Sequence, residues 1–384
     1  MHFNYTKGDI YFNIMVFFNP DSIPKDILIE FFEANNDTQA LEHDKDHLQE
    51  IMPNLVRRGL IHRVKSDDDN VSFSMYRTLQ HALIVKLGSK PNEAQKIFSH
   101  AYRTVRRFMP ETSPTQTPNK LLWPQLDLAA LHVLRLRQLY ISGSPISFEG
   151  SLTLAKMFYD AGFHIWEVRS LDQNEGASFL AAAERILQSM CREINTEIKL
   201  QADIQAMMSQ LIENIGVSKW PEVIDRRQKA RIIRKELLDD EKKRSQIDPS
   251  HKVDPDIELQ YYNAVNDDGV SACQRNEFLQ AHVDFNQRYE QYQKWGNKQT
   301  HAFEYAKHYH NMAYIRMYEG KYKNAIDLAQ KGVSLVEPGT ARYCWFQYDL
   351  ACIILQSGNL QQALELHLNV LSLRKEICGE RSSS

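Results

Sequence analysis

Apolar and polar positions alternate between helical and strand patterns over the first 88 residues. The run YFNIMVFF, at residues 11–18, is apolar apart from one asparagine and predicts a buried helix. DSIPKDILIEFF predicts a second helix, with Ser22 as its cap and Pro24 in its first turn. DHLQEIMPNLVRR predicts a third helix, which Gly59 ends in a left-handed turn.

Two strands and one more helix complete this part of the pattern. LIHRV and VSFSM are short β-type runs, and the Asp- and Asn-rich segment between them suits a turn. The second run leads directly into a helix predicted over residues 77–87. Three helices with a two-stranded wing make a winged helix, which we expect over residues 1–88.

Beyond residue 88 the periodicity is helical almost throughout. A helix is expected around residues 92–108, followed by PETSPTQTPNK, where three prolines among Ser and Thr indicate a linker. Helical hairpins follow, and a second break, QIDPSHKVDPD, precedes the last third of the chain. The expected domains are a winged helix at 1–88, a helix and linker at 89–120, repeat-like hairpins at 121–250 and three repeats at 251–380.

Small residues recur at fixed offsets in three windows of the last third. A first small residue is followed by Gly or Asn seven positions later and by Ala five positions after that. Two antiparallel helices approach closely only where small residues meet, and Gly or Asn tolerates the left-handed turn that ends the first helix. The repeat-packing positions are Gly269, Asn276 and Ala281; Ala313, Gly320 and Ala325; and Ala351, Gly358 and Ala363.

These windows resemble tetratricopeptide repeats. Their spacing is 44 and then 38 residues, longer than the standard repeat of 34, which suggests longer helices or loops. An earlier window at 154–186 has Ala155 and Gly162 at the same seven-residue offset and is interpreted as a repeat-like hairpin. The fold class expected is mostly α, a winged helix followed by an α-α superhelix of tetratricopeptide-like hairpins.

The resemblance implies a concave groove that binds peptides and is lined by the first helix of each repeat. Amide, aromatic and single cationic groups suit a peptide better than an acidic tail, and the Lys/Arg set of carboxylate-clamp repeats is lacking. An alternative is that several of these residues pack against neighbouring helices. The inward positions are Asn263, Asn266, Val270 and Cys273; Lys307, His310, Tyr314 and Met317; and Trp345, Tyr348, Cys352 and Leu355.

Six phrases along the chain carry a second resemblance: FFNPDSIPKDIL, LVRRGLI, MYRTLQ, WPQLDLAALHVL, FEYAKHYHNMAYIR and LACIILQSGNLQQAL. On these phrases the whole chain resembles the part of a fungal NOD-like (STAND-type) receptor that follows its NB-ARC-like nucleotide-binding domain. In that family a Met-His motif at the strand-to-helix junction touches nucleotide phosphates. Here the motif falls on Met75 and Tyr76, and tyrosine supplies no cation near neutral pH. Tyr76 is instead expected to pack under the wing.

A nucleotide-binding function is not expected, because the 384 residues contain no G-x-x-x-x-G-K-S/T loop to cradle phosphates. Two groups of possible metal ligands are better explained by solvated surface. His43 and His47 share a helix face but lack an evident third ligand. The aspartates at 67–69 lack EF-hand spacing and suit a charged hairpin tip. No cofactor, metal or catalytic constellation is therefore expected.

Composition narrows the possible partners. Apolar residues make up 43% and charged residues 25%, and the net charge of −3 argues against a broad nucleic-acid-binding face. The basic run at residues 226–235 is followed by acidic residues, which predicts a solvated, salt-bridged helix. Five scattered cysteines without a CxxC pair suggest reduced thiols and a cytoplasmic location. No apolar run is long enough to span a membrane.

We therefore expect a non-enzymatic adaptor or scaffold that binds a protein or peptide partner in the groove of its repeats. One alternative is a fragment of an ATP-switched receptor whose nucleotide-binding domain is missing from this chain. Another is nucleic-acid binding through the winged helix, which is disfavoured because only the C-terminal end of DHLQEIMPNLVRR is basic. The oligomeric state is left open.

Overall fold

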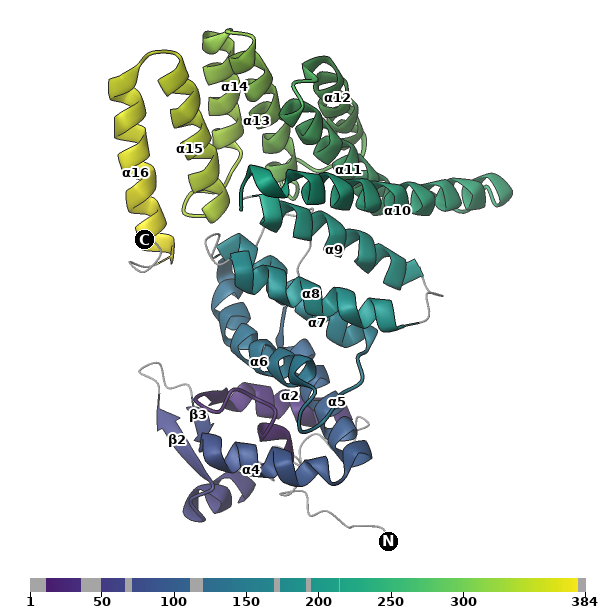
Figure 1. The fold of residues 1–384 in the computed structure, drawn as a ribbon, viewed down its shortest axis with the longest axis vertical. Helices are drawn as coiled ribbons and strands as arrows, with labels where there is room; N and C mark the ends of the chain where they lie inside the picture. The colour runs from purple at the N-terminus through teal and green to yellow at the C-terminus, as the bar shows by residue number, and fades with distance from the viewer. Residues whose placement is uncertain are drawn as a thin grey trace. The chain divides into compact units, whose positions relative to one another are not determined.

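The computed structural model is mostly helical and divides into two compact units (Figure 1). The first unit contains residues 1–111, 119–161 and 181–190, and the second contains residues 112–118, 162–180 and 191–384. The residues that the structure describes are 12–35, 50–65, 71–110, 120–168, 173–190, 195–213 and 215–378.

A small antiparallel sheet lies in the N-terminal part of the first unit. It has the order β1-β3-β2, from β1 (Ile23–Pro24), β2 (Ile61–Lys65) and β3 (Val71–Met75). The hairpin β2–β3 pairs Ile61 with Met75, and these are the two strands predicted from LIHRV and VSFSM. The third strand was missed, because a two-residue strand has no periodicity. Pro24 therefore lies in β1, and the helix that was expected to include it begins one residue later.

Helices build the core of the first unit beside this sheet. Residues 12–15 and 50–57 are helical, and Gly59 has a φ of 66°, which lets the chain turn into β2. The buried Phe17 lies edge-to-face with Phe98 at 5.7 Å, and Phe98 stacks on Phe148 at 4.2 Å. The longer helices are α2 (Lys25–Asn35), α4 (Arg77–Gly88), α5 (Pro91–Phe108) and α6 (Trp123–Ser142), which follows the short helix η1 (Lys120–Leu122).

Two helices contribute to both units. They are α7 (Leu152–Val168) and α8 (Gln173–Ser189). Gly162 lies inside α7, so the prediction that it ends a repeat-like first helix is wrong. A Cβ at Gly162 would lie 3.1 Å from the Gly176 carbonyl oxygen and 3.2 Å from the Leu180 side chain. Gly162 therefore serves the close packing of α7 on α8 rather than a turn.

The second unit is a run of helices that pack in consecutive pairs (Figure 1). Each of the pairs α11/α12, α13/α14 and α15/α16 is joined by a short connection, as a repeat requires. Within the described ranges no helix combines the length and the apolar character needed to cross a membrane. The helices are α9 (Asn195–Glu213), α10 (Trp220–Ile247) after η2 (Val217–Lys219), α11 (Pro255–Gln274), α12 (Phe278–Trp295), α13 (Ala302–Tyr318), α14 (Tyr322–Ser334), α15 (Ala341–Gln356) and α16 (Leu360–Cys378).

The three pairs turn in the same way. Asn276, Gly320 and Gly358 have φ values of 61°, 73° and 89°, and each lies just after the first helix of its pair. In each turn an amide N–H donates to a carbonyl five residues earlier, as Glu277 does to Ala272 at 2.8 Å. This hydrogen bond is the mark of a Schellman helix end, and it satisfies a carbonyl that the helix would otherwise leave unpaired.

Small residues lie where the paired helices cross. Ala313 and Ala351 on the first helices are buried, as are Ala281, Ala325 and Ala363 on the second helices. At Gly269 an added Cβ would lie 2.6 Å from the Phe285 ring of α12, so no larger residue fits without a shift. The offsets of seven and five residues therefore correspond to a crossing, a turn and a second crossing in all three pairs.

Candidate functional site

The first helices of the three pairs, α11, α13 and α15, are linked directly by side chains from the predicted groove. Asn311 on α13 donates to the Asn266 side-chain oxygen on α11 at 2.9 Å. The Tyr314 hydroxyl on α13 donates to the Asp349 carboxylate on α15 at 2.7 Å. Asn266 and Tyr314 were expected to line the groove, and here their polar groups join one repeat to the next.

A buried ionic cluster holds α11, α12 and α13 together. The Arg288 side chain is fully buried, and its Nε donates to the Asn263 oxygen at 3.0 Å. Its Nη1 donates to the Glu304 backbone carbonyl at 2.7 Å, and its Nη2 pairs with the Glu304 carboxylate. Lys307 Nζ donates to the same carboxylate at 2.9 Å. Lys307, the cation expected in the groove, is therefore already committed.

The Glu304 carboxylate is ionised in this cluster. Burial alone would raise its pKa, but Lys307 and Arg288 outweigh burial and hold the pKa below its usual range. At Lys307 the effect of burial is larger than that of Glu304, so the pKa of the Lys307 ammonium group is lowered. A buried carboxylate shared by two cations is strongly destabilised if one partner is removed, so this cluster has a structural role.

His310 is enclosed by aromatic rings between α13 and α15. Its ring centroid lies 4.5 Å from that of Phe346 and 5.3 Å from that of Trp345. Its Nε2 lies 3.5 Å from the Asp349 carboxylate. Burial lowers the pKa of His310 to about 4 and raises the pKa of Asp349 to about 7. His310 is thus uncharged at neutral pH, and its approach to Asp349 is a polar contact rather than an ion pair.

Exposed apolar side chains remain on one face of α15. Trp345, Tyr348 and Leu355 are 40%, 44% and 41% exposed. Their spacing, with Cys352 between them, places all of them on one side of the helix. The Tyr348 ring lies 5.2 Å from His367 on α16, and the Arg374 guanidinium lies 5.8 Å from the same ring. We call Trp345, Tyr348, Cys352 and Leu355 the α15 face.

The predicted groove residues differ in what they contact. Asn263, Asn266, His310 and Tyr314 make contacts between helices. Lys307 pairs with Glu304 of its own helix. Met317, together with Val270 and Cys273, packs on the apolar clusters of the repeats. Large side chains of the predicted groove stay exposed only on α15, the first helix of the third pair. The alternative of packing between helices therefore describes most of the first two repeats.

Sequence reasoning missed a row of ion pairs that join α10 to α9 and α11. Arg227 pairs with Glu213 of α9 at 2.6 Å, and Arg234 pairs with Asp203 of α9 at 2.9 Å. Arg231, between them, pairs with Asp268 of α11. The prediction of a solvated helix is wrong for Arg227 and Arg234, whose side chains are only 3% and 7% exposed. The spacing of these arginines on one helix face could have indicated a contact with other helices, but their partners are distant in the sequence.

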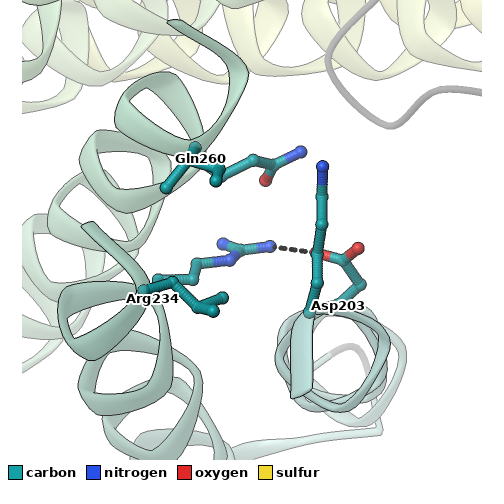
Figure 2. A pocket seen from close by; sticks show the side chains of 6 residues that line it. Asp203, Arg234 and Gln260 are labelled. Atoms are coloured by element: carbon teal, nitrogen blue, oxygen red, sulfur yellow. Dashed lines mark hydrogen bonds and ion pairs between the residues drawn. The ribbon is translucent and has the colours of Figure 1, made fainter. Parts of the chain in front are cut away.

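A small cavity opens beside this row (Figure 2). It is lined by Lys199, Asp203, Arg234, Leu237, Ile257 and Gln260, and Figure 2 shows the Arg234–Asp203 pair beside Gln260. Its volume of about 10 Å³ has room for roughly one water molecule. Burial raises the pKa of Asp203, an effect that Arg234 opposes. A cavity of this size is a packing detail of the helix contact and is too small for a ligand.

A second buried pair was also missed. Glu167 on α7 pairs with Arg342 on α15, and both side chains are at most 5% exposed. The Arg342 guanidinium lies 3.9 Å from the centre of the Phe303 ring. This pair anchors the start of α15, and no local pattern in the sequence connects residues this far apart.

The strand-to-helix junction differs from expectation. Tyr76 is 55% exposed, so the prediction that it packs under the wing is wrong. Its ring lies edge-to-face with His62 of β2, with centroids 4.7 Å apart. The next residue, Arg77, forms an exposed ion pair with Asp21. Tyr76 is held at the surface because the preceding strand residue, Met75, takes the buried position.

The possible metal ligands discussed from the sequence are not among the described residues. They are His43, His47 and the aspartates at 67–69. In the part of the chain that the structure does describe, no three His, Cys, Asp or Glu side chains are grouped so that they could hold a metal ion.

Comparison with known proteins gives one family match and several similar structures. Residues 8–91 match a family model described as a domain of unknown function, DUF7779. No curated protein matches the chain. A Rap protein complexed with competence and sporulation factor is similar at a TM-score of 0.46 and 10% identity, covering 92% of this chain and 98% of that chain.

Two further solved structures are similar over a smaller part of the chain. BtubC (BKLC) from P. vanneervenii has a TM-score of 0.35 and 13% identity, covering 67% of this chain and 92% of that chain. Nearly identical TPR-like repeats from Podosopora anserina have a TM-score of 0.34 and 12% identity, covering 59% of this chain and 97% of that chain. At such low TM-scores these similarities carry neither fold nor function to this chain.

Proposed function

We propose that this chain is a non-enzymatic interaction scaffold that holds a protein or peptide partner against the α15 face. The observation that carries the proposal is the exposure of Trp345, Tyr348 and Leu355 on one side of a well-anchored helix. Aromatic side chains on a rigid support are the residues that most often dominate binding energy at protein interfaces. α15 is such a support, because α13, α14 and α16 all pack against it.

The surroundings of the α15 face indicate what the partner offers. Lys307 is engaged by Glu304, so a clamp for a terminal carboxylate is not available on α13. The Arg374 guanidinium lies 5.8 Å from the centre of the Tyr348 ring, beside the face. A peptide that presents apolar side chains, with an acidic group toward Arg374, fits this arrangement. Tetratricopeptide-like repeats bind extended peptides on their first helices, which agrees with the position of the face.

Peptide selection tests the proposal. Peptides are selected on the purified chain from a random displayed library, and the consensus peptide is titrated by fluorescence polarisation. We expect Trp345→Ala and Tyr348→Ala each to weaken binding at least tenfold, because each removes about 1.4 kcal/mol or more at a central anchor. Leu279→Ala is the matched control, since Leu279 is 88% exposed on α12 and lies off the face. Binding that survives both aromatic substitutions contradicts the proposal.

For the N-terminal unit we infer a winged-helix arrangement. The sheet order β1-β3-β2 supports it, as do the helical residues 50–57 before the β2–β3 hairpin. We further infer that the whole chain corresponds to the winged helix and the repeats of a STAND-type receptor, because its sequence resembles that part of such receptors. A full-length transcript that continues upstream into a phosphate-binding loop would favour the receptor-fragment alternative. Free thiols at Cys273, Cys344 and Cys352 are compatible with a cytoplasmic location.

A further inference from the structure

α16 carries exposed leucines on a side of the helix that does not pack into its own repeat. Leu360, Leu364, Leu368 and Leu371 are 67%, 55%, 58% and 46% exposed. Their spacing of four, four and three residues places them in one narrow stripe along the helix. Ala363 and Val370, which are buried, lie on a different face. We call these four leucines the α16 stripe.

The preceding repeat shows what such a stripe does. The repeats that contain α14 and α16 are 38 residues apart, so Ile326 corresponds to Leu364 and Val333 to Leu371. Ile326 and Val333 pack on the apolar cluster that contains Leu350, Ile353 and Ile354 of α15. Two positions that pack on an apolar cluster in α14 are therefore exposed in α16, at Leu364 and Leu371. α16 is the outermost helix of the pairs in Figure 1.

The other end of the repeat array cannot receive this stripe. α10 packs along α11 and ties itself there through Arg227, which donates to the Ser271 hydroxyl at 3.1 Å, and through the Arg231–Asp268 pair. A head-to-tail contact between two copies would have to displace α10 from α11, together with this hydrogen bond and this ion pair. The stripe of a second copy, in contrast, is exposed and offers an apolar counterpart of the same length.

The stripe is suited to pairing with itself. A two-fold contact places the same residues on both sides, and two antiparallel helices with Leu364 opposite the partner copy's Leu368 bring four leucines against four. His367 borders the stripe and packs against Tyr348. No Asp, Glu, Lys or Arg lies on this side of the helix between the first and last leucine, so two copies bury no like charges. From this geometry we infer that the chain forms a two-fold dimer through α16. The inference is independent of the proposed peptide binding.

Sedimentation equilibrium of the full chain tests the dimer. We expect the wild-type chain to sediment at twice the monomer mass at micromolar concentration. Leu364→Glu combined with Leu368→Glu should give the monomer mass and weaken the dimer by more than about a hundredfold, because unpaired charges would be buried. Both leucines are more than half exposed, so the substitutions leave the repeat core intact. Circular dichroism checks that the helix content is unchanged.

A matched control adds the same charge elsewhere on α16. Gln362 and Asn369 are exposed on another side of the helix, and Gln362→Glu combined with Asn369→Glu should leave the dimer intact. A wild-type chain that is monomeric at all concentrations overturns the inference. Equal dissociation of the stripe variant and the control variant also overturns it, because the contact would then lie elsewhere or depend on net charge alone.

Discussion

The close crossing at Gly269 gives a prediction whose magnitude follows from the structure. A Cβ at this position would lie 2.6 Å from Cε1 and 2.9 Å from Cδ1 of Phe285. Phe285 is 1% exposed and packs with Ala272, Ala281 and other buried side chains, so its ring has little freedom to move. Gly269→Ala must therefore separate α11 from α12 or push the ring off its rotamer.

Two opposing effects set the size of the change. Overpacking a well-packed core costs about 1–3 kcal/mol, while Ala in place of Gly inside a helix gains about 1 kcal/mol. We expect Gly269→Ala to lower the free energy of unfolding by about 1 kcal/mol. Gly332→Ala in α14 is the matched control. Its Cβ would meet the Ala306 carbonyl oxygen and the Phe346 ring at 3.4 Å, so the helix gain should remain, at about 0.5 kcal/mol.

Urea unfolding followed by circular dichroism compares the two variants. Native-state hydrogen exchange should place the loss of protection in α11 and α12 for Gly269→Ala. The decisive quantity is the difference between the variants, about 1–2 kcal/mol by this reasoning. If Gly269→Ala is as stable as Gly332→Ala, the helices tolerate a methyl group at the crossing and the packing argument is refuted.

Three further predictions concern buried charge and backbone. Glu304→Gln should lower the free energy of unfolding by about 3–5 kcal/mol, because it leaves the buried Arg288 and Lys307 without a full counter-charge; the exposed control Glu319→Gln should change it by less than about 1 kcal/mol in the same urea assay. Asp349 faces His310 and Tyr314 of α13 and Arg374 of α16, and its folded pKa of about 7 lies above the ordinary 3.8. The folded chain therefore binds more protons between these values, and the wild type loses stability as the pH rises through this window. The free energy of unfolding of Asp349→Asn should thus exceed that of the wild type by up to about 4 kcal/mol above pH 7 and should equal it near pH 4. A pH-independent difference in urea midpoint would contradict this. Asn276 has a φ of 61°, so Asn276→Ala should destabilise the chain by about 1 kcal/mol and Asn276→Gly should not; equal melting temperatures would contradict this.

Local patterns predicted local structure well. The strand-to-helix junction at Met75 and Tyr76 follows from a β-type run that meets a helical one, and the left-handed turns fall at Asn276, Gly320 and Gly358. A turn depends on the residues that form it, so its signal lies within a few positions. The failure at Gly162 has the same origin, because a glycine at a helix crossing and a glycine at a helix end look alike until the partner helix is known.

The candidate site was less predictable, since its exposure depends on residues far apart in the sequence. Periodicity placed His310 and Trp345 on first helices, but only the structure shows that His310 is enclosed and Trp345 is 40% exposed. Arg227 illustrates the same limit. Its charge suggested a solvated helix, whereas the Arg227 side chain is buried and has partners on two other helices, Glu213 and Ser271.

The contacts of Arg288 have a consequence for how the repeats unfold. In arrays that are stabilised mainly by neighbouring units, cooperativity depends on the energy of each interface. Arg288 belongs to α12 but binds Asn263 of α11 and Glu304 of α13. If the repeat that contains α13 frays, Arg288 loses its counter-charge, and the repeat before it is left with a buried cation. One side chain thus makes partial melting of the array costly, so these two repeats should open and close as a single cooperative block.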